Sequence, residues 1–214
     1  MCGTGFAFPC EVSLTDAPSI SRSWLSQRLL CAHDLPAEPG VLRYVHAPDF
    51  VSTPAAVLVP LINRPAGITV MFTQRTAHLN DHAGQISFPG GRVDPGDVDR
   101  VYTALREAEE ETGVARELVA ILGSLPEYDI PTGFRVTPIV GWIEPPVSFA
   151  PDPFEVAEVF EVPLTHFLDP DNHQRHSDER NGRRRHYYCM PYEGRNIWGA
   201  TAGMLHMLYR ALRA

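Results

Sequence analysis

The pattern of apolar and polar positions predicts one helix near each end of the chain. In residues 19–32, apolar side chains recur at the spacing of a single helix face. These side chains are Ile20, Trp24, Leu25, Leu29 and Leu30. Ser19 or Ser21 can cap this helix by accepting a backbone hydrogen bond. The last helix is predicted at about residues 200–212, and one side of it is formed by Met204, Leu205, Leu208 and Leu212.

Between these helices, short runs rich in β-branched and aromatic residues predict strands. Residues 55–62 and 68–73 flank a turn-forming segment and predict a hairpin in a central sheet. Pro60 indicates that part of the first strand lies at an edge or a bulge, because proline has no N–H to donate. Further strands are predicted at residues 118–125, 134–143, 156–162 and 184–190, and a short helix at residues 163–168.

Residues 33–53 are predicted to form a long connection. This segment contains four residues that interrupt helices and strands, Pro36, Pro39, Gly40 and Pro48. Because this length is unusual in a compact domain, we expect it to wrap the surface or to contribute to a homodimer interface. A chain of 214 residues suits one domain of ordinary size. We therefore expect residues 1–50 to supply a helix and a connection packed on a body formed by residues 51–214.

One predicted helix, within residues 88–114, is unusually acidic. At roughly 100° per residue, one face of it carries Val101, Leu105 and Ala108. The opposite face carries Glu107, Glu110 and Glu111. Like charges at this spacing destabilise a helix by roughly 0.2–0.5 kcal/mol per pair, so the cluster requires a counter-charge. Carboxylate oxygens are hard ligands that suit Mg²⁺ or Mn²⁺.

Two glycines precede this helix. Gly90 and Gly91 can turn the backbone sharply and bring the Gly90 carbonyl oxygen close to a bound ion. A glutamate-rich helix is more often a solvated face, because glutamate is a good helix former that is usually exposed. Here an arginine, three glutamates and flanking glycines occur together at defined spacings, which favours a metal site.

Residues 91–114 resemble the Nudix box, usually written G-x5-E-x7-R-E-U-x-E-E-x-G-U, where U is a bulky apolar residue. Residues 106–114 match its second half, with Ala108 and Val114 at the apolar positions. In the first half, Asp97 stands where the glutamate would be, and Arg106 follows it one residue later than usual. The resemblance implies an α/β protein with a Nudix-like α/β/α sandwich and a central mixed β-sheet. It also implies pyrophosphate hydrolysis with Mg²⁺ or Mn²⁺.

The same resemblance implies roles for the box residues. Glu107, Glu110 and Glu111 would hold the metal, with Glu107 or Glu111 as the closest ligands. Arg106 would hold a glutamate in place rather than touch the substrate. Some family members take their general base from a glutamate on a loop after the box, and Glu155 is the candidate here. Two further carboxylates compete with it, Glu158 and Glu161.

A second motif precedes the box and resembles the signature of the Nudix coenzyme A pyrophosphatases. It comprises residues 71–76, Leu79, His82, residues 84–85 and residues 87–91. In that subfamily a box that is one residue longer and carries Asp is also usual. The resemblance implies cleavage of coenzyme A or acyl-coenzyme A into adenosine 3′,5′-bisphosphate and 4′-phosphopantetheine or its acyl derivative.

Several residues outside the box are candidates for substrate binding. Arg75 and Gln85 are placed either to contact the phosphates and polar groups of the substrate or to brace the loop before the box. Arg184 lies in a basic run, which is either a solvated edge or a clamp for a terminal phosphate. Core or interface positions are expected for Tyr187, Tyr188 and Trp198, in preference to stacking on a base.

Composition limits the function classes. A formal charge of −8 disfavours nonspecific nucleic-acid binding, which needs Lys and Arg to neutralise phosphates. No apolar run approaches a membrane span, and the first residues lack the features of a signal peptide. The four scattered cysteines indicate reduced thiols, so we expect a cytoplasmic protein with a small-molecule substrate.

Two alternatives remain open from sequence. The Nudix box specifies the bond that is cut and not the appended groups, so ADP-ribose, NADH or a dinucleotide is an alternative substrate. A Nudix fold can also serve as a ligand-sensing module without turnover. That alternative predicts losses among the catalytic glutamates, which are all present here.

Overall fold

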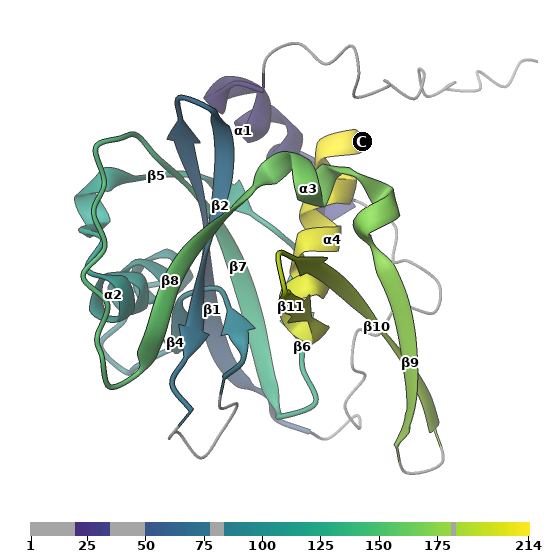
Figure 1. Cartoon of the computed structure of the whole chain (residues 1–214). Helices are drawn as coiled ribbons and strands as arrows, with labels where there is room; N and C mark the ends of the chain where they lie inside the picture. The colour runs from purple at the N-terminus through teal and green to yellow at the C-terminus, as the bar shows by residue number, and fades with distance from the viewer. Residues whose placement is uncertain (1–19, 35–49, 78–83, 181–182) are drawn as a thin grey trace, which may run out of the picture.

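The structure is a computed structural model that describes residues 20–34, 50–77, 84–180 and 183–214, without the side chains of residues 180, 183 and 184. The predicted hairpin is confirmed, because β1 (Thr53–Arg64) and β2 (Gly67–Arg75) pair antiparallel. β1 also pairs in parallel with β7 (Phe134–Ile143), a strand that the sequence predicted. The central sheet is therefore mixed, as expected (Figure 1).

Eight strands make up this sheet. Its main path runs in the order β3-β2-β1-β7-β5, and β8 pairs with β2, β4 with β1, and β6 with β7. The remaining strands are β3 (Ile86–Ser87), β4 (Gly90–Arg92), β5 (Val119–Ser124), β6 (Tyr128–Asp129) and β8 (Val156–Pro163). β5 and β8 confirm two predicted strands. The sequence did not predict β3, β4 and β6, because two or three residues are too few to show a period.

Pro60 lies inside the sheet, and the prediction of an edge or bulge is wrong. On one side β1 pairs with β7, where Pro60 lies opposite Gly141. On the other side β1 pairs with β4 at residues 55–57 and with β2 at residues 61–64. Pro60 falls between these two partner strands, so its missing N–H interrupts neither of the two ladders.

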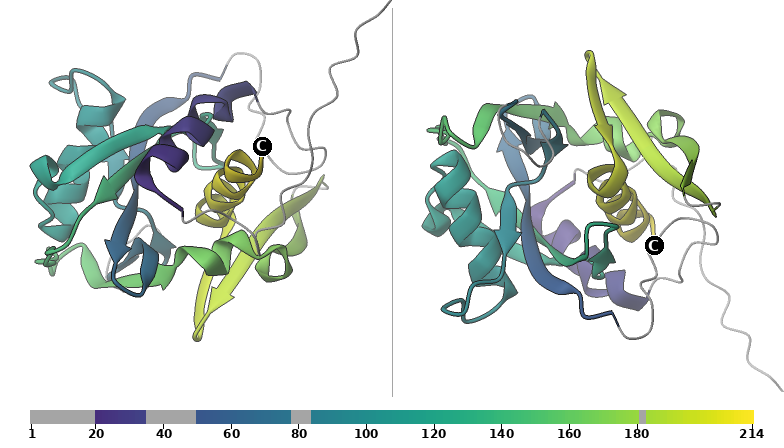
Figure 2. Two further views of the ribbon diagram at one scale, coloured as in Figure 1. Left: turned by 90° about the horizontal axis from the view of Figure 1, so that it is seen from above. Right: turned by 90° about the horizontal axis from the view of Figure 1, so that it is seen from below.

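Helices cover both faces of the central sheet (Figure 2). α2 (Arg100–Thr112) packs on β1 and β4, whereas α1 (Arg22–Leu30) packs on β5 and on α4 (Gly199–Arg213). This arrangement confirms the α/β/α sandwich. The Ser21 hydroxyl caps α1 by accepting the Trp24 N–H at 3.2 Å. Leu30 was expected to be buried but is 79% exposed, because it lies about 100° away from the buried Leu29 around the helix.

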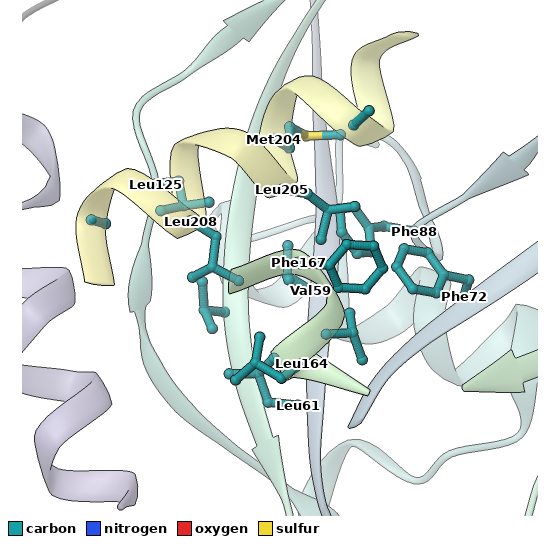
Figure 3. Packing of buried hydrophobic residues seen from close by; sticks show 14 of the residues in the cluster. Val59, Leu61, Phe72, Phe88, Leu125, Leu164, Phe167, Met204, Leu205 and Leu208 are labelled. Atoms are coloured by element: carbon teal, nitrogen blue, oxygen red, sulfur yellow. The ribbon is translucent and has the colours of Figure 1, made fainter. Parts of the chain in front are cut away.

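Two apolar clusters fill the spaces above and below the sheet. The larger cluster lies under α1 and α4, and Figure 3 shows its centre. There the centre of the Phe72 ring lies 5.2 Å from the centre of the Phe88 ring and 5.6 Å from the ring centres of Phe160 and Phe167. Phe167 comes from the predicted short helix, α3 (Leu164–Leu168). The smaller cluster lies under α2 and includes Ala104 and Ala108.

A second sheet of three strands lies beside the main one (Figure 1). It consists of β9 (Gln174–Arg180), β10 (Arg183–Tyr192) and β11 (Arg195–Trp198), paired antiparallel in the order β11-β10-β9. β10 contains the strand predicted at residues 184–190. β9 was not predicted, because its sequence QRHSDER offers no apolar face and its pairing with β10 holds it in place.

Short 3-10 turns complete the described residues: η2 (Ala32–Asp34), η3 (Arg116–Leu118) and η4 (Pro170–Asn172). In the described part of the chain, no helix is long and apolar enough to span a membrane. Most of the predicted connection lies at residues 35–49, outside the described residues. The domain boundary at residue 50 and the homodimer interface therefore stay predictions.

Candidate active site

The acidic helix α2 is fixed at both ends. At its start, the Asp99 carboxylate accepts the Tyr102 N–H at 2.7 Å. At its end, Gly113 adopts a left-handed conformation with φ of 72°, which glycine allows without steric strain. The loop that follows β7 is tied to the last turn, because the N–H groups of Ala150 and Asp152 donate to the carbonyls of Thr112 and Glu111 at 2.8 and 3.1 Å. The side chains of α2 therefore have defined positions.

The three box glutamates lie in different environments. Glu111 is only 7% exposed, the Glu107 side chain is 19% exposed, and the Glu110 side chain is 59% exposed. The prediction that all three lie opposite the apolar face is therefore wrong for Glu111. Seven residues separate Glu111 from the buried Ala104, which places it only about 20° away around the helix. Glu111 thus borders the apolar face instead of opposing it.

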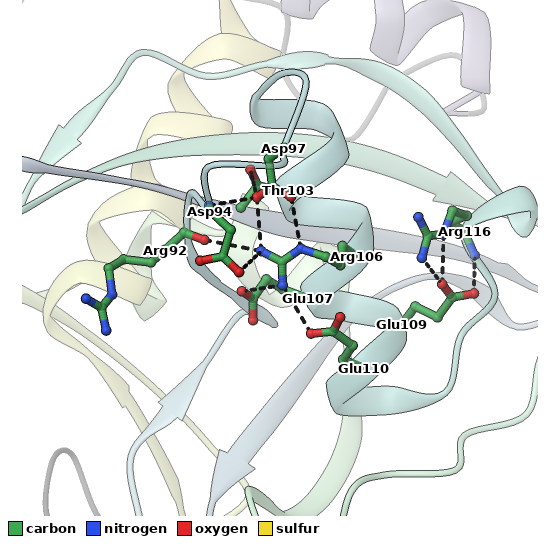
Figure 4. Close-up of polar contacts among 9 residues, drawn as sticks. All are labelled: Arg92, Asp94, Asp97, Thr103, Arg106, Glu107, Glu109, Glu110 and Arg116. Atoms are coloured by element: carbon green, nitrogen blue, oxygen red, sulfur yellow. Dashed lines mark hydrogen bonds and ion pairs between the residues drawn. The ribbon is translucent and has the colours of Figure 1, made fainter.

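Arg106 connects the box helix to the turn before it (Figure 4). Its Nε and Nη2 atoms donate to the two carboxylate oxygens of Asp97, both at 3.0 Å. Its Nη1 atom lies 2.9 Å from a Glu107 oxygen and 3.1 Å from a Glu110 oxygen. Arg106 therefore contacts two of the three candidate ligands, as its predicted positioning role requires.

Asp97 is well placed for this pairing. Its side chain is 3% exposed and accepts hydrogen bonds from the Asp94 N–H at 3.0 Å and the Thr103 hydroxyl at 2.8 Å. The hydrogen bonds from Arg106 and from the Asp94 backbone hold the pKa of Asp97 well below its usual range. Asp97 in turn raises the pKa of Arg106, so this pair stays charged. Sequence did not identify Thr103 as part of this network.

Gly91 leaves room for the Glu107 carboxylate. A Cβ atom at position 91 would lie 2.5 Å from Cδ and Oε1 of Glu107. Burial raises the pKa of Glu107, and the neighbouring Arg106 opposes this shift. At Gly90, where φ is 156°, a Cβ atom would collide with the backbone of Ala56 and Val57. A side chain at position 90 would therefore meet fixed backbone, whereas a side chain at position 91 would displace the Glu107 carboxylate.

Four groups act on the ionisation of the Glu111 carboxylate. Burial, followed by the charges of Glu107 and Glu155, raises the pKa of Glu111, and the net value is about 8. The positive charge of Arg75 and a hydrogen bond from the Gly90 backbone act in the opposite direction. The charges of Arg75, Glu107 and Glu155 and the Gly90 backbone therefore all act on the ionisation of Glu111.

Backbone hydrogen bonds hold Glu155 at this position. Its carbonyl accepts the Thr76 N–H at 3.0 Å, and the Thr76 hydroxyl donates to the Phe154 carbonyl at 2.9 Å. The two competing carboxylates are paired elsewhere. Glu158 lies 2.6 Å from Arg195, and Glu161 lies 2.6 Å from Arg64. Of the three candidates for the general base, Glu155 is the one whose charge acts on Glu111.

Residues from the upstream motif lie next to the box. The Arg75 N–H donates to the Gln85 carbonyl at 2.9 Å, which joins β2 to the segment that leads into β3. Leu79 and His82 lie outside the described residues. Arg184 pairs with Glu179 in the β9–β10 ladder, but its side chain is not described, so the phosphate clamp stays a prediction.

The site suits a divalent cation. The charge of Glu107 disfavours ionisation of Glu111, and both carboxylates are largely removed from water. Hard carboxylate oxygens in this arrangement fit Mg²⁺ or Mn²⁺. Among the described residues, no three acidic, histidine or cysteine side chains already form a complete ligand set. Glu110 contacts Arg106 at 3.1 Å and would have to turn to join the other two.

Comparison with known proteins agrees with this site. The NUDIX domain family model matches residues 52–181, which is more than half of the chain. A Photorhabdus laumondii protein named "Uncharacterized Nudix hydrolase NudL" is 43% identical over 154 residues, covering 72% of this chain and 82% of that protein. A Pectobacterium atrosepticum protein of the same name is 42% identical over 170 residues, covering 79% and 86%. This chain belongs to the Nudix family.

More specifically, it is a Nudix hydrolase of the pyrophosphohydrolase type. Nudix enzymes act on small nucleotide substrates and generally use divalent metal ions such as Mg²⁺ or Mn²⁺. Solved structures show a more distant likeness. A MutT/Nudix family protein from Enterococcus faecalis is 18% identical with a TM-score of 0.47, covering 78% of this chain and 64% of that chain.

Proposed function

We propose that this enzyme hydrolyses the pyrophosphate of coenzyme A or acyl-coenzyme A. The products are adenosine 3′,5′-bisphosphate and 4′-phosphopantetheine or its acyl derivative. The supporting observation is the position of the upstream motif, which resembles that of the coenzyme A subfamily. Arg75, within this motif, acts on the Glu111 carboxylate of the box. The two motifs therefore contribute to one site.

The residues of the site divide the work of pyrophosphate hydrolysis. Glu107, Glu110 and Glu111 would hold Mg²⁺ or Mn²⁺ together with the Gly90 carbonyl, and the metal neutralises charge on the phosphoryl oxygens when bound. Arg106 is a positioning residue: Asp97 holds its guanidinium in place, and the guanidinium in turn orients Glu107 and Glu110.

Four residues outside the box complete the proposal. Glu155 accepts a proton from the attacking water as general base; the support for this role is that its charge acts on Glu111. Arg75 supplies positive charge for the phosphates, and Gln85 supplies an amide for polar groups of the substrate. Arg184 binds the 3′-phosphate of coenzyme A through its guanidinium.

A substrate panel tests the substrate class. Products from coenzyme A, ADP-ribose, NADH and a nucleoside triphosphate are separated by chromatography with Mg²⁺ or Mn²⁺ present. Coenzyme A should have the highest kcat/KM, and excess chelator should stop the reaction. More efficient cleavage of ADP-ribose would overturn the substrate class, and unchanged turnover in chelator would overturn the metal requirement.

Dephospho-coenzyme A tests the arginine clamp separately. It should have a higher KM than coenzyme A, because it lacks the 3′-phosphate. Arg184→Ala should remove that difference without changing the metal requirement. Equal handling of the two compounds by the parent enzyme would discard the clamp and leave the substrate class standing.

A further inference from the structure

A cavity lies at the end of β2 that leads into the upstream motif. It has a volume of about 610 Å³ and lies between the ends of β2, β3 and β8 and the turn that joins β10 to β11. Gln74 and Gln85 line this pocket, and the Arg75 N–H donates to the Gln85 carbonyl at 2.9 Å. The next residue, Thr76, donates its N–H to the Glu155 carbonyl at 3.0 Å. The pocket therefore lies at the same end of β2 as Arg75 and Glu155, where one end of a substrate held at the carboxylates can reach it.

The charges of the pocket make it unsuitable for a phosphate. Two carboxylates line it, Glu158 and Glu193, against one guanidinium, that of Arg195. Arg195 is already occupied, because its Nη2 atom lies 2.6 Å from a Glu158 oxygen and its guanidinium carbon lies 4.5 Å from the centre of the Phe160 ring. The remaining acidic charge would repel an anion. A neutral group of the substrate fits the pocket better.

Trp198 supplies a fixed aromatic surface. It is 42% exposed and lines the pocket from the end of β11. The Tyr187 ring contacts it edge-on, with 5.7 Å between the ring centres. Ile197 is fully buried, so the strand turns Asn196 and Trp198 together away from the core. Trp198 is therefore not a core residue in the described fold, and the expectation that it lies at an interface stays a prediction.

Amide side chains surround the indole. Gln74, Gln85 and Asn196 all line the pocket. Asn196 is oriented by the Cys189 thiol, which donates to its Oδ1 atom at 2.7 Å, and Gln74 donates to the Gly84 carbonyl at 3.3 Å. Asn and Gln amides can form two hydrogen bonds with N6 and N7 of adenine, and indoles stack on bases.

We propose that this pocket binds the adenine ring of the substrate, with Trp198 stacked on the base and the neighbouring amides reading its edge. This inference rests on the proposed function only in requiring an adenosine-containing substrate, so it holds for coenzyme A, ADP-ribose and NADH alike. The competing occupant is the pantetheine arm of coenzyme A, which is also neutral and carries amides.

Tryptophan fluorescence tests the proposal without turnover. AMP, IMP and 4′-phosphopantetheine are titrated in excess chelator into the parent, Trp198→Phe and Trp24→Phe proteins. AMP should change the emission of the parent and of Trp24→Phe, because Trp24 lies on α1, and the change should be lost in Trp198→Phe. IMP, which lacks the 6-amino group, should bind roughly 5- to 150-fold more weakly, and 4′-phosphopantetheine should not alter Trp198 emission.

Contrary results are equally clear. An AMP signal that persists in Trp198→Phe, or a Trp198 signal from 4′-phosphopantetheine instead of AMP, overturns the proposal. The comparison of AMP with IMP on the parent protein does not depend on any variant folding, and equal affinity for the two overturns base-edge recognition.

Kinetics separates this proposal from the proposed function. Trp198→Leu should raise KM for coenzyme A by roughly 5- to 150-fold, with a smaller change in kcat, because stacking is lost from bound substrate as well as from the transition state. Binding of AMP at Trp198 without hydrolysis of coenzyme A supports the pocket and overturns the substrate class. If the enzyme hydrolyses coenzyme A but AMP does not change Trp198 emission, the substrate class is supported and the adenine pocket is overturned.

Discussion

The two faces of the central sheet are built for different purposes. Under α1 and α4, large apolar side chains such as Phe72 and Leu205 are almost completely removed from water. Under α2, the side chains that meet the sheet are small, chiefly Ala104 and Ala108. Because these are only methyl groups, α2 can lie close to β1 and β4, and Glu107 and Glu111 reach the strands at its flank.

This difference places function and stability on opposite sides of one sheet. An ionised carboxylate removed from water is unfavourable unless a cation or a hydrogen-bonded partner compensates it. On the α2 face, Glu111 borders the apolar cluster and lies near Glu107, so that face carries electrostatic strain. The large apolar cluster on the other face supplies stability that offsets it. Violations of packing rules are expected at functional sites.

The largest effect is expected from Glu111→Gln. Turnover at saturating Mg²⁺ should fall by about 10³-fold or more, because preorganised charge at the reacting phosphate is lost. The melting temperature of the metal-free protein should stay the same or rise, since repulsion from Glu107 is removed. Steady-state kinetics and calorimetry measure the two effects. Turnover within a few-fold of the parent enzyme would remove Glu111 from the site.

Glu155→Gln should reduce kcat by on the order of 10²–10⁴-fold and change KM much less, because a general base acts only as the transition state forms. Glu161→Gln is the matched control on β8, since its carboxylate pairs with Arg64 and Thr69 instead. The control should keep its kcat. An effect of Glu155→Gln that appears only in KM would assign the base to another carboxylate.

Phe72→Ala tests the opposite face. Phe72 is fully buried among Phe88, Phe160 and Phe167, so its loss should reduce the free energy of unfolding by about 3–5 kcal/mol. Leu30→Ala is the control, because Leu30 is 79% exposed and should change stability by less than about 0.5 kcal/mol. Chemical denaturation compares them, and similar losses for both variants would contradict the division between the two faces.

The sequence predicted the helices and strands whose own residues show a clear local pattern. Apolar spacing predicted α1 and α4, runs rich in β-branched and aromatic residues predicted the β1–β2 hairpin and the strands β5, β7 and β8, and a proline at the first turn predicted α3. β9 could not be predicted in this way, because only its pairing with β10 makes it a strand. The position of Pro60 was predicted wrongly, because a proline is tolerated where the partner of β1 changes from β4 to β2. No local sequence pattern shows that change.

The site was predictable in composition but not in geometry. The spacing of the box identified Arg106 and the three glutamates, and the structure brings two of those glutamates to Arg106. Sequence could not distinguish Glu111, whose burial depends on how α2 packs on the sheet. The space that Gly91 leaves for Glu107 is likewise a tertiary feature. The metal-ligand and general-base roles of these residues stay predictions.

Arg106→Lys should weaken activity or the affinity for Mg²⁺ by about 10- to 100-fold, the usual effect of losing a residue that orients metal ligands. Lysine cannot reproduce the two parallel bonds to Asp97 while it also contacts Glu107 and Glu110. Arg116→Lys is the matched control, because Arg116, in η3 just after α2, pairs with Glu109 of α2 and not with the candidate ligands. Mg²⁺ titrations of turnover compare the two variants. Equal effects would mean that Arg106 has only a structural role.

The smallest effect is expected from Gly91→Ala. The φ of Gly91 is not in the left-handed region, so alanine should change the free energy of unfolding by less than about 1 kcal/mol. Its Cβ, however, would lie 2.5 Å from Cδ of Glu107 and displace that carboxylate. We expect kcat to fall about tenfold, below the 10²-fold loss that a 1 Å misplacement can cause, because the end of a glutamate side chain can partly readjust. Gly96→Ala is the control, since a Cβ there meets open space. If both variants kept full activity at saturating Mg²⁺, the position of Glu107 against β4 would not matter for turnover. The functional contrast between the two faces would then rest on Glu111 and Glu155 alone.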